Sequence, residues 1–303
     1  MSSYFERIPQ SDKLALPVRR AFIEISDPSE DDKPKKEKFR RLEGLNVRFD
    51  IKRSITGIMP SATIAVCNLA QYDLQYLVNF FGTKGAWSAG NYRIIRLFAG
   101  YGKNVRLLFQ GYVYKFSASM PPDIWLTFEC ISCFNINTAQ VSFSLNDTCS
   151  LQRICEIVAE QISLKLDYRA TTDKTFLNPS FDGNGYDAVD YLRGLDEERT
   201  KISVTPDRLE VTDLSEQSDR KWIISPQTGL IGTPVFEPTG MTSFITLLNP
   251  DAQSADLVSL RSIIVNCPYK EHKVWTLRHF GELRGNGFFT EWYAAPVHSS
   301  KEE

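Results

Sequence analysis

The side chains most able to do chemistry in this sequence are six cysteines, three histidines and 37 acidic residues. Cys130 and Cys133 form a CxxC pattern, which suits a redox pair or half of a zinc site. They lie in WLTFECISCF, where apolar and polar residues alternate as in a strand. Residues three apart on a strand point to opposite faces, so shared coordination is disfavoured. We interpret this pair as buried thiols.

The histidines and acids form no pattern typical of an active site. His272, His279 and His298 all lie near the C-terminus, and the first two, seven apart on strand-like sequence, fall on opposite faces unless a bulge intervenes. The acid pairs Asp31–Asp32 and Glu197–Glu198 lie in polar runs typical of solvated surface. The sequence contains no HExxH, GxSxG or Walker pattern. It therefore predicts no catalytic, cofactor-binding or metal-binding residue, and no enzyme.

The composition of the 303 residues is that of a folded protein with more than one core. A formal net charge of -2 disfavours a nucleic-acid-binding domain, which usually carries a basic excess. Tyr112, Tyr114 and Lys115 are the nearest match to an aromatic and basic binding surface, and core packing explains them as well. The chain has no signal peptide and no run of about 20 apolar residues. We expect a protein made in a cytoplasm, with no membrane partner.

Two stretches of alternating sequence enclose a helical one. Strand patterns fill 17–143, as in NVRFDIKRS, where Val47, Phe49 and Ile51 share a face, and one short helix is predicted at AQYDLQYLVNFFG. Seven or so strands predict a closed or nearly closed barrel. The charged segment DPSEDDKPKKEKFRRLEG is predicted to be an exposed loop, with its basic run at Lys33 to Arg41.

Over 144–212 the apolar residues recur about every 3.6 positions, as in helices, instead of at every second position, as in strands. Thr148 is the expected N-cap of a helix over SLQRICEIVAEQISLK, a second helix follows in YDAVDYLRGLDEERT, and KISVTPDRLEVTD predicts a hairpin. This region is expected to be a small α+β domain.

Strand patterns return over 213–303 and follow the same order as in the first stretch. The predicted fold is mainly β: two antiparallel β-barrels with a small α+β domain inserted between them. The expected domains are an N-terminal arm over 1–16, a first barrel over 17–143, the insertion over 144–212, and a second barrel with a C-terminal tail over 213–303. Turn residues such as Gly229, Gly232 and Pro234 set the geometry of the second barrel.

Three blocks, at about 46–69, 99–132 and 222–293, resemble the baseplate hub proteins of contractile-tailed bacteriophages. They contain VRFDIKRSITGIMPSATIAVCNL, AGYGKNVRLLFQGYVYKFSAS, and the segments Thr228 to Pro234 and Leu247 to Pro250. The chain departs from the family pattern at Ala255 and Asp256, where a glycine usually stands, and at Phe280 and Glu282, in a block that resembles a His-x-Gly-Asp segment. In the family this block is structural, so no chemistry is assigned to His279.

The resemblance implies that both antiparallel β-barrels are tail-tube-like, each similar to one tail-tube subunit. A homotrimer would then present six similar barrels in a ring. Such a ring would adapt a hexameric tail tube to a trimeric central spike in the tail baseplate of the virion, after assembly in the host bacterial cytoplasm. The implied partners are tube or tube-initiator ring proteins above and the spike below, with the tape-measure protein and baseplate wedge proteins as further candidates. Genome DNA would pass through the lumen without specific binding.

Three alternatives remain open at this point. The chain could be a distal-tail or tube-initiator ring protein of a related contractile injection system, a cell-wall-degrading tail enzyme, or a carbohydrate- or nucleic-acid-binding barrel. The duplication favours the hub, because a single tube subunit needs only one barrel. For the hub we expect the insertion to lie outside the ring, and the lumen to be neutral to acidic so that DNA does not adhere.

Overall fold

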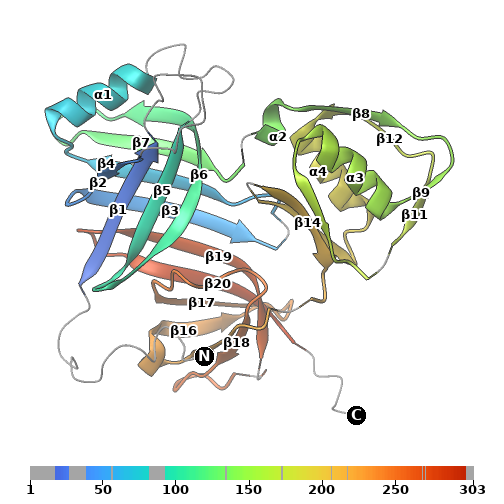
Figure 1. The fold of residues 1–303 in the computed structure, drawn as a ribbon. Coiled ribbons are helices and arrows are strands. Elements are labelled where there is room, and N and C mark those ends of the chain that lie inside the picture. The colour runs from blue at the N-terminus through green and yellow to red at the C-terminus, as the bar shows by residue number, and fades with distance from the viewer. Residues whose placement is uncertain are drawn as a thin grey trace. The chain divides into compact units, whose positions relative to one another are not determined.

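The computed structural model describes residues 18–297 apart from 27–38, 82–92 and seven single positions: Thr56, Phe134, Thr172, Pro206, Gln217, Pro268 and Lys270. The N-terminal arm, most of the charged loop and His298 therefore lie outside the described residues. The chain is mainly β, as predicted, and forms two compact units (Figure 1). The first comprises Met1–Arg53, Ser61–Ile131 and Ser218–Glu303, and the second comprises Ser54–Pro60 and Ser132–Gln217.

The first unit takes its strands from two stretches of sequence. We call the first stretch the N-terminal β segment. It contains β1 (Arg19–Ser26), β2 (Phe39–Leu42), β3 (Asn46–Ser54), β4 (Ser61–Cys67), α1 (Gln71–Phe81), β5 (Ile94–Tyr101), β6 (Asn104–Ala118) and β7 (Trp125–Ile131). The alternation of β3 is realised as predicted, with Val47, Phe49 and Ile51 buried. One expectation is wrong: FRRL, read as part of the charged loop, is β2 and pairs with β1.

The second stretch, the C-terminal β segment, also reads as strands in the structure. It contains β15 (Lys221–Ile224), the 3-10 helix η4 (Pro226–Thr228), β16 (Leu230–Phe236), β17 (Thr242–Leu247), β18 (Leu257–Leu260), β19 (His272–Glu282) and β20 (Phe288–Pro296). Gly229 and Gly232 have φ values of 105° and 71°, a backbone conformation that residues with a Cβ rarely adopt. The predicted turn role of these two glycines is therefore visible in the backbone.

The two β segments repeat the same order of strands. In the first, the hydrogen-bonded order is β3-β4-β7-β6-β5-β1, and in the second it is β16-β17-β20-β19-β18-β15. Each strand of one series has its counterpart in the other at the same place in the chain order. The series differ at the end, because β1 runs antiparallel to β5 whereas β15 runs parallel to β18.

The register of the strands repeats as well. Ile64 of β4 stands opposite Phe128 of β7, and Phe244 of β17 stands opposite Trp292 of β20. Counted outward from these two pairs, all six residue pairs between β17 and β20 have a counterpart between β4 and β7. Both pairings are continuous antiparallel ladders, so this alignment assigns each residue of β17 and β20 a counterpart in β4 and β7.

A bulge also recurs at the corresponding place. The pairing of β6 with β7 shifts between Val113 and Lys115, and that of β19 with β20 shifts between Val274 and Thr276. The residue two positions before each bulge faces the first residue of the strand on the other side. Tyr112 of β6 faces Ile94 of β5, and Lys273 of β19 faces Leu257 of β18. A β-bulge bends its strand and is commonly kept as a structural device. Its recurrence supports the equivalence of β6 and β19.

The two β segments are joined into one sheet, which differs from the expected pair of separate closed barrels. β3 is hydrogen-bonded to β19, and β16 and β2 stand at the ends of the strand order (Figure 1). No pairing among the described residues closes either segment into a barrel. Superimposable barrels over 17–143 and 213–303 therefore remain a prediction, supported by the shared strand order.

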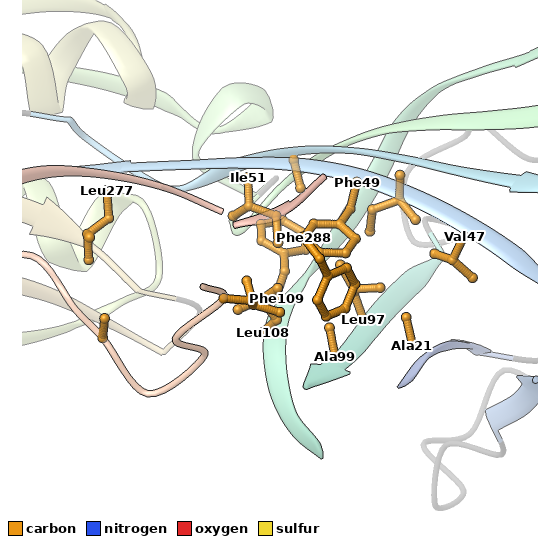
Figure 2. Close-up of a cluster of buried hydrophobic side chains, with 14 of the residues drawn as sticks. Ala21, Val47, Phe49, Ile51, Leu97, Ala99, Leu108, Phe109, Leu277 and Phe288 are labelled. Carbon is orange, nitrogen blue, oxygen red and sulfur yellow. The ribbon is translucent and has the colours of Figure 1, made fainter. Parts of the chain in front are cut away.

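One hydrophobic core serves both β segments. Phe288 of β20 lies among Phe49, Leu97 and Leu108 of the N-terminal segment, and its ring meets that of Phe49 edge-on at 5.4 Å between centroids (Figure 2). Aromatic pairs favour this geometry. The sheet junction is therefore backed by shared apolar packing.

The second unit has a core of its own and contains the predicted insertion 144–212. Its elements are α2 (Asn135–Thr138), β8 (Gln140–Ser144), β9 (Thr148–Ser150), α3 (Leu151–Gln161), β10 (Lys165–Tyr168), β11 (Thr175–Leu177), β12 (Ser180–Asn184), α4 (Gly185–Leu195), β13 (Thr200–Val204) and β14 (Arg208–Asp213). The two helices and the hairpin are found as predicted. The expected cap is wrong: Thr148 lies in β9, and the Ser150 hydroxyl accepts from the Arg153 N–H at 3.3 Å.

Candidate functional site

The two histidines of β19 are both buried, and the bulge that the prediction of opposite faces excluded is present between them. The bulge between Val274 and Thr276 intervenes and changes the alternation, so His272 and His279 are each 0% exposed. His279 Nδ1 lies 3.0 Å from Thr290 Oγ1, and burial together with the positive charge of Arg53 holds the pKa of His279 well below its usual value. Burial also lowers the pKa of His272. Both rings are therefore neutral core residues at neutral pH.

The two cysteines of the CxxC pattern belong to different units. Cys130 lies in β7 of the first unit and Cys133 in the second, and each is 1% exposed. Burial raises the pKa of Cys130, which keeps the unreactive thiol form. Among the residues that the structure describes, no three His, Cys, Asp or Glu side chains are grouped to hold a metal ion.

The remaining candidates for chemistry are solvent-exposed or paired. Glu197 and Glu198 are exposed, while Asp31 and Asp32 lie outside the described residues. Glu129 accepts from Lys115 Nζ at 2.7 Å and from the Tyr114 hydroxyl at 3.1 Å, so the charge of Lys115 is balanced. No helix within the described ranges is long and apolar enough to cross a membrane.

The residues that organise the molecule lie instead at the β3–β19 junction. Arg278 of β19 holds Asp50 of β3 with two nitrogens, at 3.0 Å from Nε to Oδ1 and 2.6 Å from Nη2 to Oδ2. This hydrogen bonding raises the pKa of Arg278. The alternation of β3 places Asp50 on its outer face, but no local pattern could indicate its partner 228 positions away.

Glu282 anchors the other end of the junction. It accepts from Asn46 Nδ2 at 2.7 Å and from Arg48 Nη2 at 2.9 Å, while the Leu283 N–H donates to the Val47 carbonyl at 2.9 Å. Burial acts to raise the pKa of Glu282, but the hydrogen bonds from Asn46 and Arg48 outweigh it and lower the pKa. The segment from His279 to Glu282 thus has a structural role. A shallow surface hollow overlies these ion pairs.

Two further contacts link the β segments. The Tyr101 hydroxyl donates to the Phe288 carbonyl at 2.9 Å and accepts from the Leu248 N–H at 3.3 Å. Arg19 Nη1 donates to the Gly285 carbonyl at 2.6 Å. Backbone groups of the C-terminal segment therefore depend on side chains of the N-terminal one, which holds the duplicated halves in one arrangement.

The turn after Leu-Leu-Asn-Pro forms without the glycine usual in the resembling family. Ala255 stands there with a φ of 75°, and its N–H donates to the Val274 carbonyl at 2.9 Å. The next residue, Asp256, is fully buried and accepts from Trp222 Nε1 at 2.8 Å and Arg220 Nε at 3.0 Å. The buried carboxylate fixes a turn that the backbone alone would disfavour.

Comparison with known proteins agrees with this duplicated, non-catalytic architecture. Residues 31–291 match the family described as baseplate hub gp41. The chain belongs to this family. No curated protein matches the sequence closely enough to add a relative. The chain is thus a structural component of the tail baseplate, associated with the virion, and not an enzyme.

Solved structures show the same fold at low sequence identity. The 43 kDa tail protein of prophage MuSo2 from Shewanella oneidensis is similar with a TM-score of 0.62 and 10% identity, over 92% of this chain and 97% of that one. The tail protein of Neisseria meningitidis MC58 gives 0.58 and 8%, over 91% and 96%.

A third structure comes from a secretion system. The E. coli c3393 protein, a type VI secretion component described as similar to the T4 bacteriophage tail proteins gp27 and gp5, gives a TM-score of 0.59 and 9% identity, over 84% of this chain and 74% of that one. The fold is therefore shared between tail proteins and this secretion component.

Proposed function

We propose that this baseplate hub protein assembles as a homotrimeric ring that adapts a hexameric tail tube to a trimeric central spike of a contractile tail. The observation that carries the proposal is the duplication, in which two β segments of one chain repeat strand order, register and bulge. Three such chains offer six near-equivalent β segments with threefold symmetry. A ring of this kind matches a sixfold partner on one side and a threefold partner on the other.

The duplication also favours the hub over a tube-initiator or distal-tail ring protein. A ring of six identical chains needs one β segment in each chain, whereas this chain carries two that are fixed together by the β3–β19 junction. The partners of the ring would be tube or initiator proteins above and the spike below, with tape-measure and wedge proteins as further contacts. Assembly would occur in the host bacterial cytoplasm before incorporation into the virion.

Two features of the ring follow from the proposal. The insertion would lie on the outside, because it interrupts the chain between two β segments that must line the ring. The lumen would be neutral to acidic, because genome DNA must pass without adhering and the chain has a net charge of -2.

The experiment that tests the proposal is a mass measurement of the purified protein over a range of concentrations by light scattering and native mass spectrometry. Three chains of 34.5 kDa in one particle are expected. A particle that stays monomeric at the highest concentration, or that contains six chains, would contradict it.

A further inference from the structure

The matching registers identify two strand edges that should meet when chains assemble. Within one chain, β3 adds to the edge of β19 beyond the end of β18. In the duplicated pattern, β16 is the counterpart of β3 and β6 is the counterpart of β19. Within the described residues, β16 pairs only with β17, and β6 beyond Val113 pairs only with β7. One junction of the pattern is therefore made, and the equivalent one has no partner strand.

We propose that β16 of one chain adds to β6 of the next, so that the contact between chains repeats the β3–β19 junction inside each chain. The proposal rests on the trimeric ring and names its interface. Each chain contributes one β16 edge and one β6 edge, so the contact joins different surfaces and can close into a threefold ring. Six junctions would result, alternating between those within and those between chains.

The side chains of β16 differ from those of β3 in a way that fits this contact. By register, Leu230 corresponds to the buried Val47, Ile231 to Arg48 and Val235 to Asp50. Ile231 is 39% exposed and Val235 is 58% exposed. The charges that hold the junction inside the chain are thus replaced by exposed apolar side chains. Exposed apolar side chains grouped on an edge strand mark an interaction site or an aggregation hazard.

The side chains of β6 change in the matching direction. Counting from the bulges, Ser117 corresponds to Arg278, and the loop at 120–122 corresponds to the position of Glu282. This loop reads Met-Pro-Pro, and Met120 is 87% exposed. Where one junction pairs acids with arginines, the other would bring isoleucine and valine against serine, methionine and proline. Both members of the second junction are free of charge at these positions.

This difference would prevent the wrong edges from pairing. The β3 edge placed against β6 would set Asp50 opposite Ser117 instead of Arg278, and Arg48 opposite the uncharged loop at 120–122 instead of Glu282, so both side chains would lose the partners they have inside the chain. The β16 edge against β19 would leave Glu282 without Arg48, and would leave Arg278 with only its longer contact to Glu291 at 3.4 Å. Pro234 lacks an N–H, so this position of β16 cannot donate to an added strand. Ionic and apolar junctions would therefore specify their own partners.

A charge-swap series tests the interface directly. Val235→Asp should weaken trimer formation at least about tenfold, because a lone carboxylate would be buried against Ser117. Adding Ser117→Arg to the same chain should restore the trimer, since the junction between chains then has the same kind of carboxylate–guanidinium pair that Asp50 and Arg278 form within a chain. Ile263→Asp is the matched control, because Ile263 is 76% exposed and belongs to neither β6 nor β16 but to the connection between β18 and β19. Circular dichroism checks that each variant is folded.

Disulfide trapping gives an independent readout. Chains carrying Val235→Cys and Ser117→Cys, with different tags, are co-expressed and oxidised, and linked peptides are identified by mass spectrometry. A disulfide between positions 235 and 117 is expected when the two variants are co-expressed. It is not expected when either variant is expressed alone. If the wild-type protein is a trimer but the co-expressed cysteine variants form no such link, the proposed interface is wrong while the ring still stands. The same conclusion follows if the Val235→Asp variant assembles normally. A monomeric wild-type protein would overturn the ring and the interface together.

Discussion

At the scale of single residues, Ala255 is held in a conformation that its side chain disfavours. Its φ of 75° lies in the left-handed region, where an L-residue with a Cβ is strained by about 1–2 kcal/mol. Ala255→Gly removes this strain, while the greater freedom of glycine in the unfolded chain offsets roughly 0.5–1 kcal/mol. We expect the variant to be more stable by about 0.5 kcal/mol in urea unfolding. Equal or lower stability would show that the turn carries no such strain.

His279 should make stability depend on pH. Its pKa is lowered in the folded protein, so below its usual value of about 6.5 the unfolded chain binds more protons than the folded one. The free energy of unfolding is therefore undiminished above pH 6.5 and falls as the pH drops further. His272 contributes in the same direction.

The measurement is the free energy of unfolding at pH 7.5 and 5.5. His279→Asn keeps a polar group near Thr290. From pH 7.5 to pH 5.5 its free energy of unfolding should fall by about 1 kcal/mol less than that of the wild-type protein. The variant His272→Asn serves as the comparison for the second ring. Equal pH dependence of His279→Asn and the wild-type protein would contradict a neutral, buried His279.

At the scale of elements, the duplicated strands β6 and β19 diverge at one position of close approach. A Cβ on Gly111 of β6 would lie 2.3 Å from the Ile131 carbonyl oxygen of β7. Its counterpart in β19, by register, is His272, which carries a fully buried side chain at the same place. We expect Gly111→Ala to lower the free energy of unfolding by about 2 kcal/mol or more through overpacking. Thermal unfolding measures this, with Gly102→Ala as a control of strain without a clash, since Gly102 has open space around it.

The elements themselves were largely predictable because their signals are local. The alternation of Val47, Phe49 and Ile51 predicts β3, and apolar residues at helical spacing predict α3. Alternation does not show where a bulge lies, so the sequence could name an intervening bulge as a condition for the faces of His272 and His279 but could not place it between Val274 and Thr276. The N-cap was misplaced by two residues, since Thr148 and Ser150 are both good capping residues and only tertiary pairing of β9 decides between them.

The junction between the β segments was beyond sequence reasoning for a different reason. Asp50 and Arg278 each look like ordinary surface charges in an alternating strand. Their pairing depends on edge-to-edge addition of strands far apart in the chain, which leaves no periodic trace. The duplication was inferred from the order of strands, and it is the register, available only from the structure, that assigns Ile231 and Val235 their counterparts in Arg48 and Asp50.

At the scale of the whole molecule, we expect one chain to supply two near-equivalent positions of a six-part ring. Cryo-electron microscopy of the assembled protein tests this most directly. The predicted map shows three chains around a threefold axis, with the N-terminal and C-terminal β segments alternating at rotations of about 60° and β16 continuing the sheet of the neighbouring β6. A ring in which only one β segment of each chain surrounds the axis, or in which the two segments occupy unrelated positions, would contradict it.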